Sequence, residues 1–377
     1  MTISVAATER VKATWIATVV NIDWPRANTI GNTVQQKQDL INFIDSLSAV
    51  GINTVIFQVR PTADAFYASN IEPISHWLTG KQGDWGQAEP WDPLAVAIEQ
   101  THKRQMSLHA WINPYRVNVG SITIEDLDEA HPMRLHPEWF WKYGTQWYFD
   151  PAQEVTRTWL CDVVRDIIAH YDVDGIHMDD YFYPYPIKGQ SLPDQARFKA
   201  DPRGFEDIGD WRRDNVNKTI EAVSETIREM SEDIVFGISP FGIYKSNYEQ
   251  LFADIVLWAE EGWIDYVAPQ IYWAIDSTAA SDYATLARWW ANTIPPTCEV
   301  YTGHAMYRMG EGKRWKVGNE IVRQNVCNQN IEGIDGECYY SAKFVLQQPN
   351  ALLTKQNAKI ICPCQKKVVT LRSELRK

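Results

Sequence analysis

Short apolar segments rich in β-branched and aromatic residues alternate with longer segments of helical period along this 377-residue chain. The pattern predicts eight strands, at 14–20, 53–60, 107–113, 174–181, 234–239, 265–273, 299–305 and 336–341. Between them, 37–49, 153–170 and 211–230 place apolar side chains on one helical face. Eight strands with intervening helices predict an α/β fold, a (β/α)8 TIM barrel. The doubly wound alternative usually carries a Gly-rich turn after its first strand, and none follows here.

Two long connections predict where this barrel carries its chemistry. Residues 61–92 follow the second strand and residues 182–210 follow the fourth, so we expect long loops at the C-terminal face, where barrel active sites lie. We assign residues 1–345 to the barrel domain and residues 346–377 to a C-terminal tail with a basic end.

Polar residues gather toward the C-terminal ends of the predicted strands on the inward-facing positions, since alternate residues of a barrel strand point inward. These inward residues are Gln58, Arg60, His109, Trp111, Asn113, Tyr115, His177, Asp179, Tyr181, Ser239, Gln270 and Tyr272. Polar groups that converge there need partners, because burying them unpaired costs free energy. A substrate with many hydroxyl groups would supply partners, and so would a self-satisfied network that closes the barrel.

The segment DGIHMDDY at 174–181 holds the sharpest catalytic candidates, Asp179 and Asp180. Cleaving a glycosidic bond needs one carboxyl group to protonate the leaving oxygen and a second to attack, to activate water or to stabilise the oxocarbenium charge. Alternation points Asp180 away from Asp179, so Asp64 and Asp276 remain alternatives for the second acid. His177 fits a hydrogen-bonding neighbour better than a metal ligand, because no second histidine is placed close to it by spacing.

Composition narrows the class of protein further. The net charge of −12 disfavours a nucleic-acid binder. No apolar run is long enough for a membrane span. No Walker loop, G-x-S-x-G elbow or H-E-x-x-H site occurs, so we expect neither a cofactor nor a metal. The 17 Trp and 17 Tyr residues fit either sugar stacking or a large aromatic core. The N-terminus has no signal-peptide pattern, which favours the cytoplasm as written and the cell envelope if a leader has been removed.

Several segments, in order, resemble the glycosyl-hydrolase-like family related to family-10 barrels, whose bacterial members include hydrolases of peptidoglycan glycan strands. The matching segments are NIDWP at 21–25, FQVRPTADAFY at 57–67, PISHWLTGKQG at 73–83, WDPL at 91–94, HAWINPYR at 109–116, YDVDGIHMDDYFYP at 171–184, WRRDNVN at 211–217, FGISPFGIY at 236–244 and IDYVAPQIYW at 264–273. The resemblance implies a barrel glycoside hydrolase that acts on a bacterial polysaccharide, with its site around 174–184.

GIHMD at 175–179 also resembles the strand-four motif of the α-amylase superfamily, which implies Asp179 as nucleophile, with His177 where that motif has arginine. The chitinase-type motif fits less well, because Tyr181 stands where its catalytic glutamate would be.

The leading hypothesis is therefore hydrolysis of peptidoglycan glycan strands or a related amino-sugar polymer by Asp179 and Asp180. The predicted partner is a polysaccharide or oligosaccharide, and the sequence does not indicate an oligomeric state. A carbohydrate-binding barrel without catalysis and a glycan deacylase remain alternatives. We expect substrate contacts from Gln58, Arg60, Asp64, Trp77, Trp111, Asn113, Tyr115, Arg116, His177, Tyr181, Ser239, Gln270, Tyr272 and Trp273.

Overall fold

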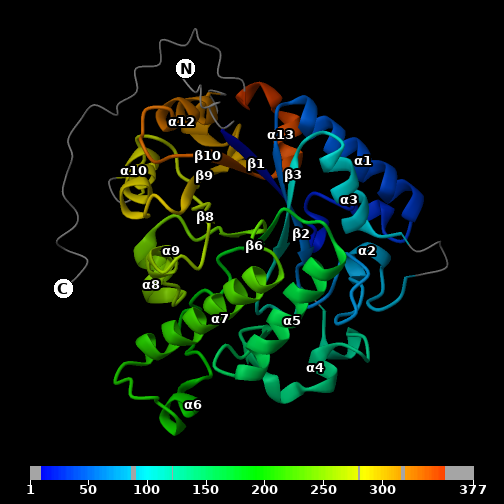
Figure 1. Cartoon of the computed structure of the whole chain (residues 1–377), viewed down its shortest axis with the longest axis vertical. Helices are drawn as coiled ribbons and strands as arrows, with labels where there is room; N and C mark the ends of the chain where they lie inside the picture. Colours follow the sequence, from blue (N-terminus) through cyan, green and yellow to red (C-terminus); the bar gives the residue numbers. More distant parts are fainter. Residues whose placement is uncertain (1–9, 86–90, 121, 279–280, 316–318, 353–377) are drawn as a thin grey trace.

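Eight parallel strands close into a barrel in the computed structural model, which describes residues 10–85, 91–120, 122–278, 281–315 and 319–352 (Figure 1). The strands are β1 (Val11–Ile16), β2 (Thr54–Arg60), β3 (Ser107–Ile112), β6 (Gly175–Met178), β7 (Val235–Ile238), β8 (Tyr266–Val267), β9 (Glu299–Ala305) and β10 (Gly336–Tyr340). They follow one another around the barrel in chain order, and β10 pairs with β1. A separate antiparallel hairpin, β4 (Phe140–Tyr143) and β5 (Gln146–Phe149), is inserted between β3 and β6. The predicted TIM barrel is confirmed.

Strands β1, β6 and β8 end three or more residues earlier than the sequence pattern predicts. The strand expected over 265–273 is regular only at Tyr266–Val267, because Pro269 has no backbone N–H to continue a ladder. Gln270 instead forms isolated bridges to Phe241 and Gly303. The strand expected over 14–20 stops at Ile16, and Val20 then adopts a φ of 54° in a turn.

Helices surround the barrel and bury their apolar faces against it (Figure 1). The longer ones are α1 (Thr33–Ala49), α3 (Pro93–His102), α5 (Glu154–His170), α7 (Ile208–Met230), α10 (Tyr283–Thr293) and α12 (Glu320–Asn328). Short helices are α2 (His76–Thr79), α4 (Pro132–Leu135), α6 (Gln195–Ala200), α8 (Tyr244–Gln250), α9 (Ile255–Glu260), α11 (Gly312–Trp315) and α13 (Ala342–Gln347). α1 and α7 begin earlier than periodicity predicts, because the Asn32 and Asp207 side chains cap their first turns.

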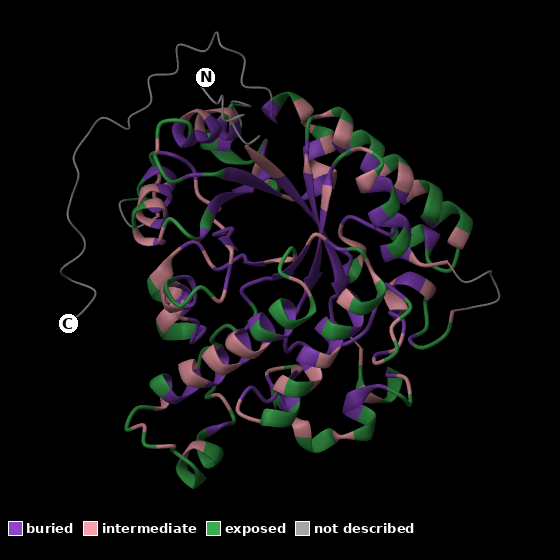
Figure 2. Ribbon diagram, viewed as in Figure 1, coloured by how far each residue is buried: buried purple, intermediate pink, exposed green. Residues whose placement is uncertain are grey.

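Apolar residues form two separate layers, one between strands and helices and one inside the barrel, and Figure 2 shows both as buried. On β2, Val55, Phe57 and Val59 join the outer layer, whereas Ile56 joins the inner one. This assignment agrees with the predicted alternation, and each buried branched or aromatic side chain contributes roughly 1.5–3 kcal/mol. The inner layer closes the barrel, so the site can lie only at a mouth.

The boundary drawn after residue 345 falls within α13, which packs against β1 and α1. The tail from 353 to 377 lies outside the described residues. No helix among the described residues is both long and apolar enough to cross a membrane.

Candidate active site

Asp179 directly follows β6, at the C-terminal mouth of the barrel, and its side chain is buried. The indole Nε1 of Trp111 donates to Oδ2 over 3.1 Å, and the Nδ2 of Asn113 donates to Oδ1 over 3.1 Å. The backbone N–H of Tyr181 donates to Oδ1 over 3.2 Å. Burial raises the pKa of Asp179, and the charge of Arg116 together with these three donors opposes that rise. The carboxylate is therefore fixed in one orientation by neighbours that favour its ionised form.

Asp180 is also buried at this mouth, although strand alternation pointed it away, because β6 ends at Met178 and the alternation ends with it. The Tyr185 hydroxyl donates to its Oδ2, and the Gln270 side chain makes a second hydrogen bond. Burial, followed by the negative charge of Asp179, raises the pKa of Asp180 to about 7. The two carboxyl groups therefore have unlike surroundings, since Asp179 has three N–H donors and the charge of Arg116, whereas Asp180 lies next to the negative charge of Asp179. Unequal surroundings of this kind are the arrangement that an acid and a nucleophile need.

A chain of hydrogen bonds runs through the barrel interior beneath the carboxylate pair. Trp15 Nε1 donates to His177 Nε2 over 3.2 Å, and Ser239 Oγ lies 2.9 Å from the same nitrogen. The Tyr266 hydroxyl lies 2.8 Å from His177 Nδ1 and 2.8 Å from His109 Nδ1. Burial lowers the pKa of both histidines, so both are neutral near pH 7. His177 Nε2 and Ser239 Oγ thus form a hydrogen bond inside the protein, beneath the mouth of the barrel.

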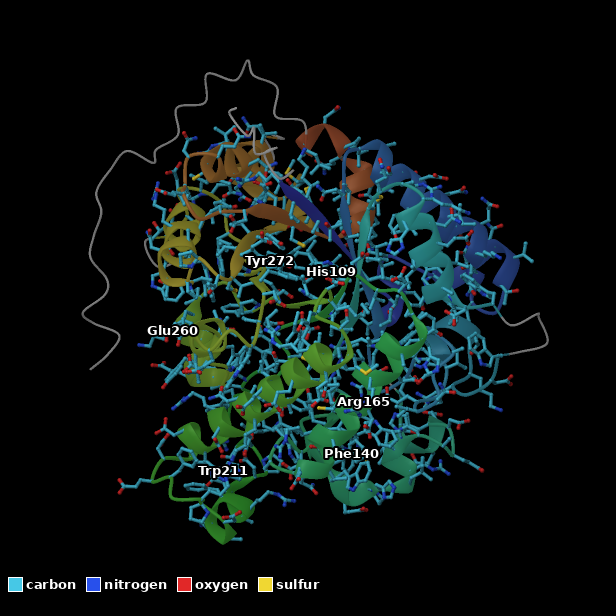
Figure 3. The ribbon with its side chains drawn as sticks, viewed as in Figure 1. His109, Phe140, Arg165, Trp211, Glu260 and Tyr272 are labelled. Atoms are coloured by element: carbon cyan, nitrogen blue, oxygen red, sulfur yellow. The ribbon has the colours of Figure 1, made fainter. Side chains whose placement is uncertain are left out.

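Several predicted contact residues do line the mouth. The Arg116 guanidinium donates to the Pro61 carbonyl over 3.2 Å and lies 4.9 Å from the centre of the Tyr181 ring, which is 37% exposed. Tyr272 and Trp273 follow β8 and are partly buried. Figure 3 labels Tyr272 and His109 within the ring of helices. Arg116, Tyr181 and Tyr272 lie close enough to the carboxylate pair to interact with it electrostatically.

Other predicted contact residues use their polar atoms inside the protein. Arg60 is fully buried, forms a 2.6 Å ion pair with Glu72, and donates to the Asn113 carbonyl. Gln58 Oε1 accepts from the backbone of Thr18 over 3.0 Å. Arg60 therefore ties the 61–92 loop to the barrel, and its charge is already satisfied there.

Three further residues that were predicted to contact the substrate pack elsewhere in the protein. Tyr115 was expected to face inward but packs in the outer layer, because β3 ends at Ile112 and Pro114 turns the chain. Asp64 is fully buried and accepts from Thr62 and Gln82, and Trp77 packs against the outer layer beside His76.

Among the described residues, no group of three or more His, Cys, Asp or Glu side chains is arranged to hold a metal ion.

The family model described as glycosyl hydrolase-like 10 matches residues 10–317 of this chain. The chain belongs to the glycosyl hydrolase-like 10 family. It is 41% identical over 357 residues to glycosyl hydrolase YngK of Bacillus subtilis (strain 168), covering 90% of this chain and 69% of that protein. It is 33% identical over 375 residues to glycosyl hydrolase DigH of Escherichia coli (strain K12), covering 90% and 84%.

Solved structures share the fold of this glycosyl hydrolase-like 10 chain at low sequence identity. The glycoside hydrolase domain of PgaB from Bordetella bronchiseptica aligns with a TM-score of 0.55 at 12% identity, over 91% of this chain and 96% of that one. An α-L-fucosidase from Paenibacillus thiaminolyticus aligns with a TM-score of 0.57 at 14% identity, over 91% of this chain and 49% of that one. Both are glycosidases, and at these identities they show the barrel alone.

Two residues of this glycosyl hydrolase-like 10 site escaped the sequence reasoning. Tyr185 lies in the 182–210 loop, whose richness in Pro and Tyr was the available signal but carries no period that points to one residue. Asp23 lies in the NIDWP segment and accepts from Ala17 N and Ser341 Oγ, which joins the ends of β1 and β10. Burial raises its pKa to about 6. Asp23 is thus a third acid at this face, and its partners are structural.

Proposed function

We propose that this protein is a glycoside hydrolase that cleaves peptidoglycan glycan strands or a related bacterial amino-sugar polymer. The observation that carries the proposal is the adjacent carboxyl pair with unequal surroundings, in which Asp179 is held by three N–H donors and Asp180 has a pKa of about 7. Membership of the glycosyl hydrolase-like 10 family supports the reaction class. The resemblance of the sequence segments to hydrolases of peptidoglycan glycan strands supports the kind of polymer, and both relatives named above come from bacteria.

Asp180 acts as the general acid in this proposal. Its proton passes to the bridging oxygen as the bond between that oxygen and the anomeric carbon breaks, and the leaving sugar departs as an alcohol. Asp179 faces the positive charge that develops on the anomeric carbon, as nucleophile or as electrostatic stabiliser. Water then supplies a hydroxyl to that carbon and returns a proton to Asp180.

The mouth offers both kinds of contact that a polar sugar needs. The rings of Tyr181, Tyr272 and Trp273 provide apolar surface against which sugar faces stack. The Gln270 amide and the Arg116 guanidinium provide donors near the carboxylates. A carbohydrate is therefore the substrate class that these side chains fit best.

The test incubates the wild type and Asp179→Asn with peptide-free glycan strands and with chitin oligomers, and reads products by mass spectrometry. We expect new reducing ends from the wild type and a loss of at least about 10²–10³-fold in the variant, the usual cost of removing one group that stabilises charge in the transition state. Asp172→Asn is the matched control, because the Asp172 side chain is 93% exposed.

The remaining outcomes separate the alternatives. Equal activity of Asp179→Asn and wild type would refute the assignment of the nucleophile. Tight binding of glycan without any product would favour the non-catalytic carbohydrate-binding barrel. Release of a carboxylic acid without new reducing ends would favour a glycan deacylase.

A further inference from the structure

A hollow opens on the same face of the barrel as the carboxylate pair. It encloses about 550 Å³, within the size range of small-molecule pockets, and is lined by Trp273, Ala274, Arg308, Glu311, Arg314 and Trp315, among others. Trp273 follows β8, whereas the charged lining residues follow β9. The hollow is therefore built from two adjacent connections at the C-terminal face. We call it the β8–β9 pocket.

Aromatic rings connect the β8–β9 pocket to the active site. Tyr185, which donates to Asp180, has its ring centre 6.1 Å from that of Phe241. Phe241 in turn lies 5.6 Å from Trp273, on the wall of the pocket. A row of rings from the acid to the pocket is a surface along which neighbouring sugars of one chain can lie. The pocket is therefore suited to a sugar unit beside the cleaved bond.

The charge of the β8–β9 pocket is unusual for this acidic chain. Arg308 and Arg314 carry two positive charges, against the single negative charge of Glu311. Arg308 is held in place, because its Nη1 donates to the Tyr272 carbonyl over 2.8 Å and its guanidinium lies 5.2 Å from the Trp315 ring centre. Its Nε also lies 3.6 Å from Glu311, which neutralises part of its charge.

Arg314 differs from Arg308, since it is exposed and makes no ion pair with any carboxylate among the described residues. A guanidinium beside tryptophan rings fits a ligand that combines an apolar sugar face with a carboxylate, which arginine can bind through two parallel hydrogen bonds. A neutral sugar would use the rings and leave this charge without a counter-charge.

We propose that the β8–β9 pocket is a subsite for a carboxylate-bearing sugar of the polymer, with Arg314 as the group that binds the carboxylate. This inference rests on the proposed function and deepens it, because it assigns the preference for an acidic glycan over a neutral one to a particular place. The positioned Arg308 and the ring of Trp273 complete the subsite around the sugar.

The test compares kcat/KM for peptide-free glycan strands, which carry lactyl carboxylates, with kcat/KM for neutral chitin oligomers. We expect Arg314→Ala to lower the ratio of the acidic to the neutral value about fivefold. The effect is modest because a hydrogen bond to a charged group that is exposed to water keeps only part of its strength. Arg314→Glu should lower the ratio further. The loss should appear in KM. Arg165→Ala is the matched control, since Arg165 is 45% exposed on α5 and pairs only with Asp162 among the described residues.

Strands whose carboxylates have been converted to amides provide a second comparison. The ratio of kcat/KM on these amidated strands to kcat/KM on chitin oligomers should be the same for the wild type and for Arg314→Ala. An unchanged ratio in both Arg314 variants, or an equal loss on acidic and neutral polymers, would overturn the subsite.

If the wild type cleaves neither polymer, the proposed function fails while the subsite can still be measured. Calorimetric titration of acidic and neutral oligosaccharides into wild type and Arg314→Ala then gives the same comparison for Kd. Equal affinity of the two proteins for the acidic ligand would overturn the subsite by itself.

Discussion

Replacing Tyr185 with phenylalanine removes one hydroxyl from Asp180 and leaves the aromatic ring in place. The Tyr185 hydroxyl donates to Asp180 Oδ2, and this bond lowers the pKa of Asp180 against the larger rise caused by burial and by Asp179. Without the bond, the ionised form of Asp180 loses a partner, so its pKa rises above about 7.

The size of that shift follows from the strength of the lost bond. A hydrogen bond to a charged group contributes about 1.5–3 kcal/mol, and one pKa unit corresponds to about 1.36 kcal/mol. The full loss would therefore raise the pKa of Asp180 by roughly one to two units. Since Tyr185 is 37% exposed, water replaces part of the bond, and we expect a rise of about one unit.

The pH dependence of kcat/KM measures this shift. A general acid must be protonated, so activity falls as pH rises through the pKa of Asp180, and the alkaline limb should move from near 7 to near 8 in Tyr185→Phe. Tyr171→Phe is the matched control, because the Tyr171 hydroxyl donates to Asp92 over 2.5 Å outside the site. An alkaline limb that stays in place, or moves to lower pH, would refute the role of Asp180 as the acid.

Two further predictions concern the supports of the site. Trp111→Phe removes a donor that lowers the pKa of Asp179, so that pKa should rise by about one unit. Since Asp179 must be ionised in the proposed mechanism, the acid limb of the pH profile of kcat/KM should move to higher pH. An acid limb that does not move would argue against this role of Trp111. Glu72→Gln leaves the buried Arg60 charge without its counter-charge and should lower the free energy of unfolding by about 3–5 kcal/mol in urea titrations. Arg165→Ala, in an exposed pair, should leave the unfolding midpoint near the wild-type value, and equal midpoints for both variants would contradict the importance of the buried pair.

Strand alternation predicted the barrel and the direction of most strand residues, because a period of two follows from backbone geometry alone. It predicted correctly that Trp111 faces the barrel interior. It failed where the strands end, since Tyr115 follows a proline turn and Asp180 lies past the last paired residue of β6. At those positions only the packing of neighbouring loops decides where a side chain points.

Prediction from the sequence was also limited because the partners of some residues lie far from them along the chain. Alternation placed Arg60 inside the barrel, yet no local pattern indicates that Glu72, in an irregular loop, neutralises it. Tyr185 and Arg308 lie in connections without periodicity, so their positions beside Asp180 and Trp273 became visible only in three dimensions. The candidate carboxylates and several of their partners, Trp111, Asn113 and Gln270, could be named from the sequence, whereas Tyr185 could not.

Trp111 belongs to the packed interior of the barrel and also donates its indole N–H to Asp179. In the proposed mechanism, bond breaking therefore depends on the part of the fold that tolerates least change, because a substitution there disturbs packing and chemistry together. The Arg314 side chain, after β9, is exposed and belongs to neither apolar layer. Under the proposed function, a laboratory selection for new substrates should therefore accumulate its mutations around Arg314 while leaving the floor of the barrel unaltered.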